Sequence, residues 1–204
     1  MAEIDAILFD IGNVLIEWDP RHLYRKLLPD EAERERFLSE VCTLEWHFAH
    51  DQGVSFEQNA ATLKLKHAEH ADLIDQWGAR YMEMVPGEVA GMADLLGALA
   101  NTRLGLHGLT NMPSTILPKC KAQFSLINHL QTVVVSGDEQ VCKPDQAIYK
   151  LALTRMRTDP SRILFVDDTI ANTQAAEQLG FHTHWFKHAE GLKTHLGELG
   201  VTWA

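Results

Sequence analysis

The sequence predicts an α/β protein in which a doubly wound parallel sheet forms the core and an α-helical cap is inserted after the first strand. Three observations support this fold class: short apolar runs recur along the chain, helix-like segments follow them, and a long helical stretch separates the first run from the second. The chain of 204 residues is 46% apolar and 23% charged, an ordinary globular composition. Its length suits one compact domain with a sizeable insertion.

The predicted strands are continuous apolar runs and do not alternate between apolar and polar residues. They cover residues 6–9, 104–109, 132–135 and 163–166, with a weaker fifth run at 183–186. Strands buried on both faces need apolar residues at every position, as in a parallel sheet that helices cover. Strands that alternate with helices indicate the doubly wound class.

Turn and capping residues bound the predicted helices of the core. A helix at 89–100 follows Pro86-Gly87, and its apolar residues fall on one face. Asp159-Pro160 interrupts the chain before the fourth strand. A further helix at 170–179 ends at Gly180, a residue suited to the left-handed conformation that closes many helices.

The stretch between the first two strands reads mostly as helices. Asp19 is a good N-cap, and Pro20 follows at the expected first helical position. Ser55 and Gln58 have the spacing of a capping box. We therefore expect a helical cap over residues 17–86 and an α/β core over residues 1–16 and 87–204.

Charge and cysteine content exclude several classes of protein. The 28 acidic and 18 basic residues give a net charge of −10, which disfavours nucleic acids and anionic membranes as partners. No apolar run is long enough to span a membrane, and the N-terminus carries acids where a secretory signal carries Lys or Arg. The three cysteines form no CxxC pair, which suits a reducing compartment. We expect a cytoplasmic protein that is a monomer or homodimer.

Polar residues follow four of the predicted strands. In open parallel sheets, ligands bind beyond the carboxyl ends of the strands, so these residues are candidates for a site. Taken singly, each has an ordinary explanation as a turn, cap or surface residue. Their arrival in order at one rim of the sheet favours an active site. The residues are Asp10 after the first strand, Thr110 and Asn111 after the second, Lys143 beyond the third, and Asp167 and Asp168 after the fourth.

This set of residues is chemically coherent for phosphoryl transfer. Three carboxylates that meet at one place repel one another, and Mg²⁺ is a hard cation that compensates such charge. Asp10 could then attack phosphorus and form an aspartyl-phosphate. Lys143 would neutralise phosphoryl oxygens, and the Thr110 hydroxyl would orient them.

The same residues resemble the motifs of the haloacid dehalogenase superfamily, in the branch with a helical cap after the first motif. FDIGNVL at 9–15, LTN at 109–111, KPD at 143–145 and FVDD at 165–168 match the four motifs in order, and Asn172 also fits. The resemblance implies a Rossmann-like core and Asp10 as the nucleophile. It implies Mg²⁺ held by Asp10, the backbone carbonyl of Gly12, and the pair Asp167 and Asp168. It also implies a cap that selects the substrate.

The first motif departs from the usual pattern at Gly12. Phosphatases of this superfamily usually carry a second Asp there, which acts as general acid and then as base. Loss of a positioned acid–base group typically costs about 10²–10⁴-fold in rate. The Gly-Asn-Val form is similar to that of a subset of bacterial sugar-phosphate phosphatases. Our hypothesis is a slower phosphatase, or one that takes its proton from water bound by Asn13 or from a cap residue.

Two alternatives to a phosphatase stay open. A metal-independent 2-haloacid dehalogenase needs no acid, so Gly12 is compatible with it, but the doubled charge of Asp167 and Asp168 is not. A catalytically weak protein that binds phosphorylated metabolites could do without the nucleophile. The sequence therefore favours a magnesium-dependent phosphatase of small phosphorylated metabolites, such as sugar phosphates.

The cap and the loops supply the predicted substrate contacts. We expect Gly12, Asn13 and Asn111 to bind substrate from the core, and Arg21 and Trp46 to do so from the cap. Further candidates in the cap are His22, Tyr24, His47 and His50. His107 and His184 are predicted to lie within strands in structural roles.

Overall fold

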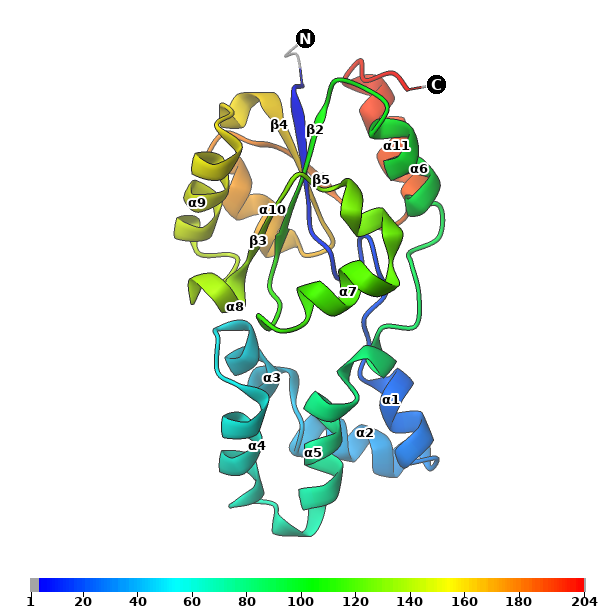
Figure 1. Ribbon diagram of the computed structural model, residues 1–204, viewed down its shortest axis with the longest axis vertical. Helices are drawn as coiled ribbons and strands as arrows, with labels where there is room; N and C mark the ends of the chain where they lie inside the picture. The colour runs from blue at the N-terminus through cyan, green and yellow to red at the C-terminus, as the bar shows by residue number, and fades with distance from the viewer. Residues whose placement is uncertain (1–3, 204) are drawn as a thin grey trace.

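The sheet is parallel throughout and has the strand order β3-β2-β1-β4-β5. The computed structural model describes residues 4–203, so Ala204 and the first three residues of the predicted core segment 1–16 lie outside the described residues (Figure 1). The strands are β1 (Ala6–Phe9), β2 (Gly105–Thr110), β3 (Thr132–Val135), β4 (Ile163–Asp167) and β5 (His182–Trp185). The predicted α/β class is thereby confirmed.

Three strands end one residue away from their predicted limits. β2 and β4 extend to Thr110 and Asp167, because these polar residues still pair with Val135 and Trp185 in the sheet. Strand β5 starts and ends one residue earlier than predicted, because its pairing with β4 runs from His182 with Leu164 to Trp185 with Asp167. Two predicted site residues therefore belong to the ends of strands, where the rigid sheet positions them, and not to the loops beyond.

Helices cover both faces of the sheet, as continuous apolar strands require. Ile7 and Phe9 of β1 pack into one buried cluster, whereas Ala6 and Leu8 pack into the other. Residues of α6 (Met92–Leu99), α7 (Leu117–Gln123) and α11 (Ala189–Glu198) join the first cluster. Residues of α9 (Gln146–Met156) and α10 (Ile170–Glu177) join the second. The short elements of the core are α8 (Ser136–Glu139), η3 (Ser125–His129) and η4 (Pro160–Arg162).

Two predicted core helices are shorter than expected. The helix predicted at 89–100 begins at Met92, because the backbone N–H of Val89 donates to the carbonyl of Leu15 and holds the connection from the cap. Gly91, with a φ of +79°, precedes that helix. The helix predicted at 170–179 ends at Glu177, and Gly180 adopts a φ of +90° as expected.

The inserted segment is helical, and it lies beyond the end of the sheet toward which β1 runs (Figure 1). Asp19 accepts a hydrogen bond from the N–H of Arg21 at 2.8 Å, although Pro20 is the N-cap and not the first helical residue. Ser55 caps the fourth helix through the N–H of Gln58 at 3.2 Å. The helices are α1 (Arg21–Leu27), α2 (Glu31–Glu40), α3 (Leu44–Asp51), α4 (Phe56–Lys64) and α5 (Ala71–Ala79), with η1 (Ala68–His70) and η2 (Tyr81–Met84).

One apolar cluster runs from the sheet into the cap. It includes Phe9 of β1, Ile16 of the connection, and Leu23 and Trp77 of the cap. The division of the chain into a cap at residues 17–86 and a core on either side of it stays a prediction. Across residues 4–203, the helices are too short or too polar to cross a membrane. All three cysteines are buried and unpaired with one another.

Candidate active site

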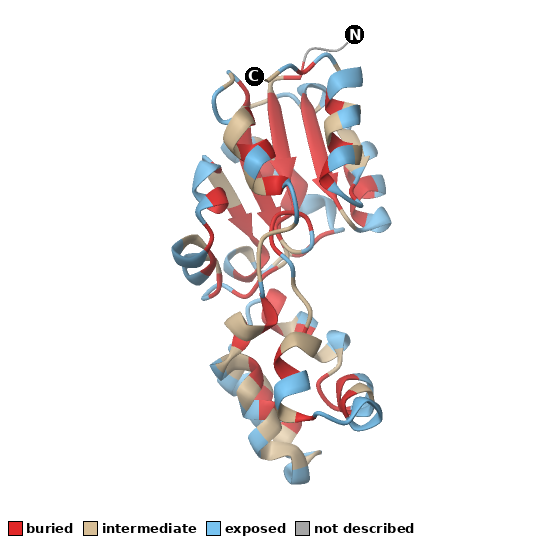
Figure 2. Ribbon diagram, turned by 90° about the vertical axis from the view of Figure 1, so that its right-hand side faces the viewer, coloured by how far each residue is buried: buried red, intermediate tan, exposed pale blue. Residues whose placement is uncertain are grey.

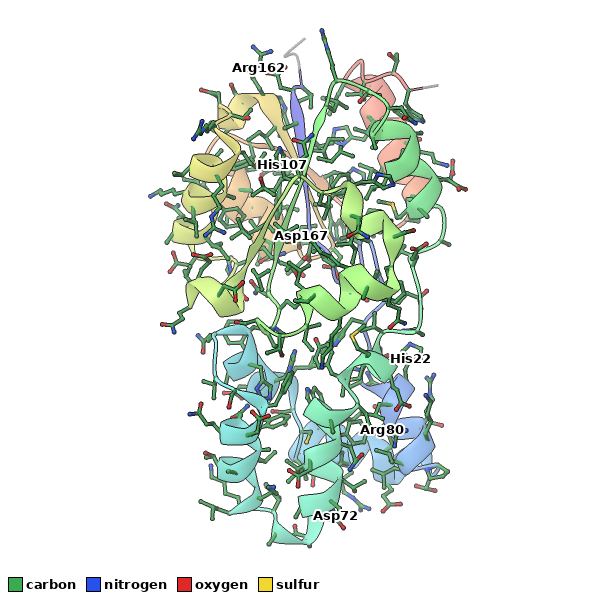
Figure 3. All side chains as sticks on the ribbon, in the orientation of Figure 1. His22, Asp72, Arg80, His107, Arg162 and Asp167 are labelled. Atoms are coloured by element: carbon green, nitrogen blue, oxygen red, sulfur yellow. The ribbon has the colours of Figure 1, made fainter. Side chains whose placement is uncertain are left out.

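A buried lysine joins two carboxylates that come from different strands. Lys143 Nζ lies 2.9 Å from Asp10 Oδ1 and 2.7 Å from Asp167 Oδ2. The exposed fractions of these three residues are 3%, 8% and 0%. The sequence placed them at one rim, and the structure brings their charged atoms into direct contact. In Figure 3, Asp167 lies within the α/β part, above the helices of the cap.

Asp167 is held rigidly by the start of α10. Its Oδ1 accepts hydrogen bonds from the N–H of Thr169 at 2.8 Å and from Asn172 Nδ2 at 3.0 Å. Asn172 Nδ2 also lies 3.1 Å from Oδ2 of the same carboxylate. The next residue, Asp168, accepts from the Trp185 indole N–H through its backbone carbonyl at 2.8 Å. The start of α10 thus orients the Asp167 carboxylate, and Trp185 of β5 fixes the backbone of Asp168.

The loop after β1 is closed by its own backbone and one side chain. The N–H of Ile11 donates to Asp10 Oδ1 at 2.7 Å. Asn13 has a φ of +55°, and its Oδ1 accepts from the N–H of Trp18 at 2.9 Å. Asn13 thereby stabilises the turn that presents Asp10. Its predicted role in substrate binding stays a prediction, as does that of Gly12.

Asn111 fastens β2 to the loop that carries Lys143. Asn111 Nδ2 donates to the Lys143 carbonyl at 3.0 Å, and the Lys143 N–H donates to Asn111 Oδ1 at 2.9 Å. Both functional groups of the amide are engaged, so Asn111 positions the lysine in this structure. Thr110 is buried at the end of β2, with its hydroxyl 3.5 Å from the carbonyl of Asn111.

The charges of the site are strongly coupled. Burial raises the pKa of Asp10 to about 7, against the opposing charge of Lys143, and the Asp167 carboxylate adds to the rise. Burial by itself lowers the pKa of the Lys143 ammonium, but the two carboxylates outweigh it and raise that pKa above its usual value. Burial and then Asp167 also raise the pKa of Asp168. The site thus carries more negative charge than one lysine neutralises.

The carboxylates of Asp10, Asp167 and Asp168 suit a divalent cation. One oxygen of each residue lies within 4.8 Å of the others. Hard cations such as Mg²⁺ favour oxygen ligands of this kind. A bound cation would offset both the burial and the repulsion that raise the pKa of Asp10, and would keep that carboxylate ionised.

The predicted cap contacts line two separate clefts. Asn13 and Arg21 line a cleft of about 680 Å³ between the first loop of the core and the start of the cap. The guanidinium of Arg21 is bound there by Glu35, at 2.6 Å. Trp46 lines a second cleft of about 550 Å³, and its indole N–H donates to the carbonyl of Asn59 at 3.4 Å. Asp10 lines neither cleft, so contact of Arg21 or Trp46 with substrate stays a prediction.

Of the other histidine and tyrosine candidates, Tyr24 and His50 have structural partners. Tyr24 is buried and donates to the carbonyl of Leu73 at 2.9 Å. His50 Nδ1 lies 3.2 Å from the Val54 carbonyl. His107 and His184 lie within β2 and β5, as expected. His22 lies on α1 at the end of the cap nearest the core (Figure 3).

One charged residue near the site was not singled out from the sequence. Asp51 is the last residue of α3 and is buried beside the segment that carries Lys143. In the sequence it is an acid at the end of a helix before Gln52-Gly53, which is an ordinary helix end. Only the packing of α3 against the core reveals its position.

Comparison with known proteins identifies relatives of the chain. A family model described as haloacid dehalogenase-like hydrolase matches residues 4–180. Protein CbbY of Cereibacter sphaeroides is 27% identical over 236 residues, covering 97% of this chain and 94% of that protein. The (S)-2-haloacid dehalogenase 2 of Pseudomonas sp. (strain CBS-3) is 25% identical over 213 residues, covering 97% and 90%. By contrast, the chain spans only 6% of acyl-CoA dehydrogenase family member 10 of Mus musculus, with 39% identity over 69 residues.

A solved structure shares the fold over nearly the whole chain. It is a haloacid dehalogenase family enzyme from Bacteroides thetaiotaomicron, in complex with magnesium and inorganic phosphate. The two chains superpose with a TM-score of 0.68 at 19% identity, over 91% of this chain and 96% of that one. At this identity the likeness extends to the fold alone.

Proposed function

The chain belongs to the haloacid dehalogenase-like hydrolase family, and we propose that it is a magnesium-dependent phosphatase of small phosphorylated metabolites such as sugar phosphates. The observation that carries this proposal is the buried group of Asp10, Asp167 and Asp168 around Lys143. Three carboxylates with one ammonium leave an uncompensated negative charge that a divalent cation would balance. The magnesium and phosphate in the Bacteroides relative support the same assignment by similarity of fold.

In this proposal Asp10, Asp167, Asp168 and the backbone carbonyl of Gly12 hold Mg²⁺. When bound, the ion neutralises charge on the phosphoryl oxygens. The residues of the chain provide the remaining chemistry. Asp10 attacks phosphorus and forms an aspartyl-phosphate, which water then hydrolyses.

The neighbouring residues position the reacting groups. Lys143 neutralises the phosphoryl group, and Asn111 holds the lysine through its backbone. The Thr110 hydroxyl, at the end of β2, orients a phosphoryl oxygen. Asn172 and the N–H of Thr169 fix the Asp167 carboxylate for its role as a ligand.

Dehalogenation is the alternative reaction, and two observations favour it. Gly12 provides no acid, and halide leaves carbon without a proton. A relative with 25% identity over most of the chain is a haloacid dehalogenase. Against it stands the third carboxylate, because a reaction without metal has no use for Asp168 in addition to the Asp10–Lys143–Asp167 group.

Hydrolysis assays separate the two reactions. We expect phosphate release from 4-nitrophenyl phosphate that requires Mg²⁺, stops on chelation and is abolished by Asp10→Asn. Asp72→Asn, an exposed change on a cap helix, is the matched control and should retain activity. The proposal would be overturned if the protein released halide from 2-chloropropionate without metal and released no phosphate from 4-nitrophenyl phosphate in the presence of Mg²⁺. A panel of phosphorylated metabolites then defines the substrate.

The partners remain predictions from composition and charge. We propose that a small phosphorylated metabolite is the substrate, and that neither nucleic acid nor membrane is a partner. The cytoplasmic location and the monomeric or homodimeric state have the same standing.

A further inference from the structure

The cap places one carboxylate against the lysine segment of the core. Asp51 ends α3, and its backbone carbonyl accepts a hydrogen bond from Cys142 Sγ at 3.3 Å. Cys142 directly precedes Lys143, whose ammonium contacts Asp10. The Asp51 side chain is only 10% exposed. A chain of direct neighbours therefore connects this cap residue to the proposed nucleophile.

The backbone just after α3 packs closely against α8 of the core. Gly53 has a φ of +97°, and a Cβ added there would lie 2.9 Å from the carbonyl oxygen of Gly137. Gly137 is equally confined, since an added Cβ would lie 2.7 Å from the backbone nitrogen of Ser114. Only glycine fits at either position without displacement of backbone. The position of Asp51 therefore depends on tight packing between cap and core.

One oxygen of the Asp51 carboxylate has no partner. Among residues 4–203, no donor lies within hydrogen-bond distance of the buried Oδ1. His47 Nε2, one helical turn earlier, lies 3.7 Å from this oxygen. Unpaired buried oxygens are uncommon in folded proteins and call for an explanation such as a catalytic role.

The state of His47 follows from its other neighbour. The Trp77 indole N–H donates to His47 Nδ1 at 3.2 Å, and an indole nitrogen can only donate. Nδ1 therefore accepts, and the neutral ring carries its proton on Nε2, on the side of Asp51. Burial lowers the pKa of His47 to about 3, so the ring is neutral at pH 7.

The groups that face Asp51 come from three segments. They are His47 on α3, Cys142 and Lys143 on the core loop, and Tyr81 on η2. Burial raises the pKa of Asp51 to about 7, and the positive charge of Lys143 opposes this rise. Such a carboxyl exchanges its proton near neutral pH, which is the range in which a general acid or base is most effective.

The core leaves room for this role at Gly12, where phosphatases of the superfamily usually carry an Asp. A Cβ added at Gly12 would meet no atom within 4 Å, and its φ lies outside the left-handed region. The backbone at position 12 therefore accepts a Cβ without a clash. An acid supplied from the cap would make one there unnecessary.

We propose that Asp51 is the general acid and general base of this hydrolase, delivered by the cap in place of an acid at position 12. The inference rests on the proposed phosphatase function. In the first step an Asp10 oxygen bonds to phosphorus and the ester P–O bond breaks. The electron pair stays on the leaving oxygen, which takes the proton of the Asp51 carboxyl and departs as the alcohol.

The second step regenerates both carboxyl groups. The Asp51 carboxylate removes a proton from a water molecule as the water oxygen bonds to phosphorus. The bond between phosphorus and the Asp10 oxygen breaks, and inorganic phosphate leaves. Asp10 returns to the carboxylate and Asp51 to the protonated acid, so each turnover consumes one ester and one water.

Two substrates that differ in their need for a proton test this role. The leaving group of ethyl phosphate is an alkoxide that must be protonated. Its ethyl group carries no hydroxyl for Asp51 to bind. The 4-nitrophenolate of 4-nitrophenyl phosphate leaves without a proton. With Mg²⁺, we expect Asp51→Asn to lower kcat on ethyl phosphate by about 10²–10⁴-fold. On 4-nitrophenyl phosphate, the first turnover should stay within about tenfold, followed by slow turnover that the absent base limits.

A second variant and a control complete the experiment. Adding Gly12→Asp to Asp51→Asn should restore at least about tenfold of the lost turnover, because an acid returns to the usual position. Asp72→Asn should leave both reactions unchanged. The proposed role of Asp51 would be overturned, without affecting the phosphatase function, by either of two results for Asp51→Asn. One is an equal loss in the first and later turnovers of 4-nitrophenyl phosphate, and the other is an unchanged kcat on ethyl phosphate. An effect of Asp51→Asn restricted to esters that carry hydroxyl groups would also overturn this role. Failure of the unmodified enzyme to release phosphate from either ester would overturn the phosphatase function as well.

Discussion

The α/β core and the cap bury their residues in different ways. The central strands β1 and β4 of the core are buried along their whole length, whereas the helices of the cap mix buried, intermediate and exposed positions (Figure 2). The buried charges also differ. In the core, Lys143 contacts both Asp10 and Asp167 directly, whereas in the cap one buried oxygen of Asp51 has no hydrogen-bond donor among the described residues. The charged groups of the core are therefore paired with one another, and the cap contributes the Asp51 carboxyl, which we propose acts on the substrate.

Replacement of the central lysine should give the largest effect on the core. Lys143→Met leaves Asp10 and Asp167 buried without their cation, which typically costs about 3–5 kcal/mol. For a chain of this size we expect Tm to fall by roughly 6–20 °C, with loss of phosphatase activity. Thermal melting at pH 8 measures the change. Exposed Lys150→Met is the control, and an equal Tm for the two variants would contradict the importance of the buried pairs.

Removal of the amide behind Asp167 should affect the metal more than the fold. Asn172→Ala deletes the donor to both Asp167 oxygens. Loss of such a supporting group typically weakens metal affinity or activity by about 10–100-fold. Titration of activity with Mg²⁺ gives the apparent affinity. Asn128→Ala, which removes a hydrogen bond to Lys121 on an exposed segment, should leave that affinity unchanged.

A methyl group at Gly53 should disturb the contact between the cap and the core. Gly53→Ala places a Cβ against the Gly137 carbonyl and strains a positive φ, so the end of α3 must move. A displacement of about 1 Å in a positioned group can cost about 10²-fold, and we expect kcat to fall by about 10–100-fold. Gly97→Ala in α6 is the matched control, because a Cβ there meets no atom within 4 Å. Equal activity in both variants would show that the close approach at Gly53 is not needed.

The smallest expected effect is on stability as a function of pH. Because the pKa of Asp51 is raised from 3.8 to about 7 in the folded chain, the native state binds this proton more tightly than the unfolded state does. Its contribution to stability is thus fully present below about pH 4 and is lost as the pH rises through 7. Asp51→Asn removes this loss, so its Tm relative to the unmodified protein should rise by about 2–4 °C or more between pH 5 and pH 8. A Tm difference that does not change with pH would contradict the raised pKa.

The comparison also shows which features can be read from a sequence. Runs such as Ala6–Phe9 specify buried strands, because continuous apolar residues satisfy only a strand covered on both faces. The sequence predicts Asp10, Lys143 and Asp167 as site residues, because the strand ends of a parallel sheet converge at one rim. Roles for Asn111 and Asn13 were harder to foresee, since an amide can bind substrate or backbone equally well. The structure shows both of them bonded to backbone.

The sequence by itself determined the α/β class, the helical insertion and the charged residues at the rim of the sheet. These features follow from local periodicity and from the geometry common to parallel sheets. Only the tertiary structure decided that Asp51 meets the Lys143 segment, that Arg21 is bound by Glu35, and that Trp46 lines a separate cleft. Each depends on how helices of the cap pack on a core that lies far away in the sequence, and no short-range pattern encodes that packing.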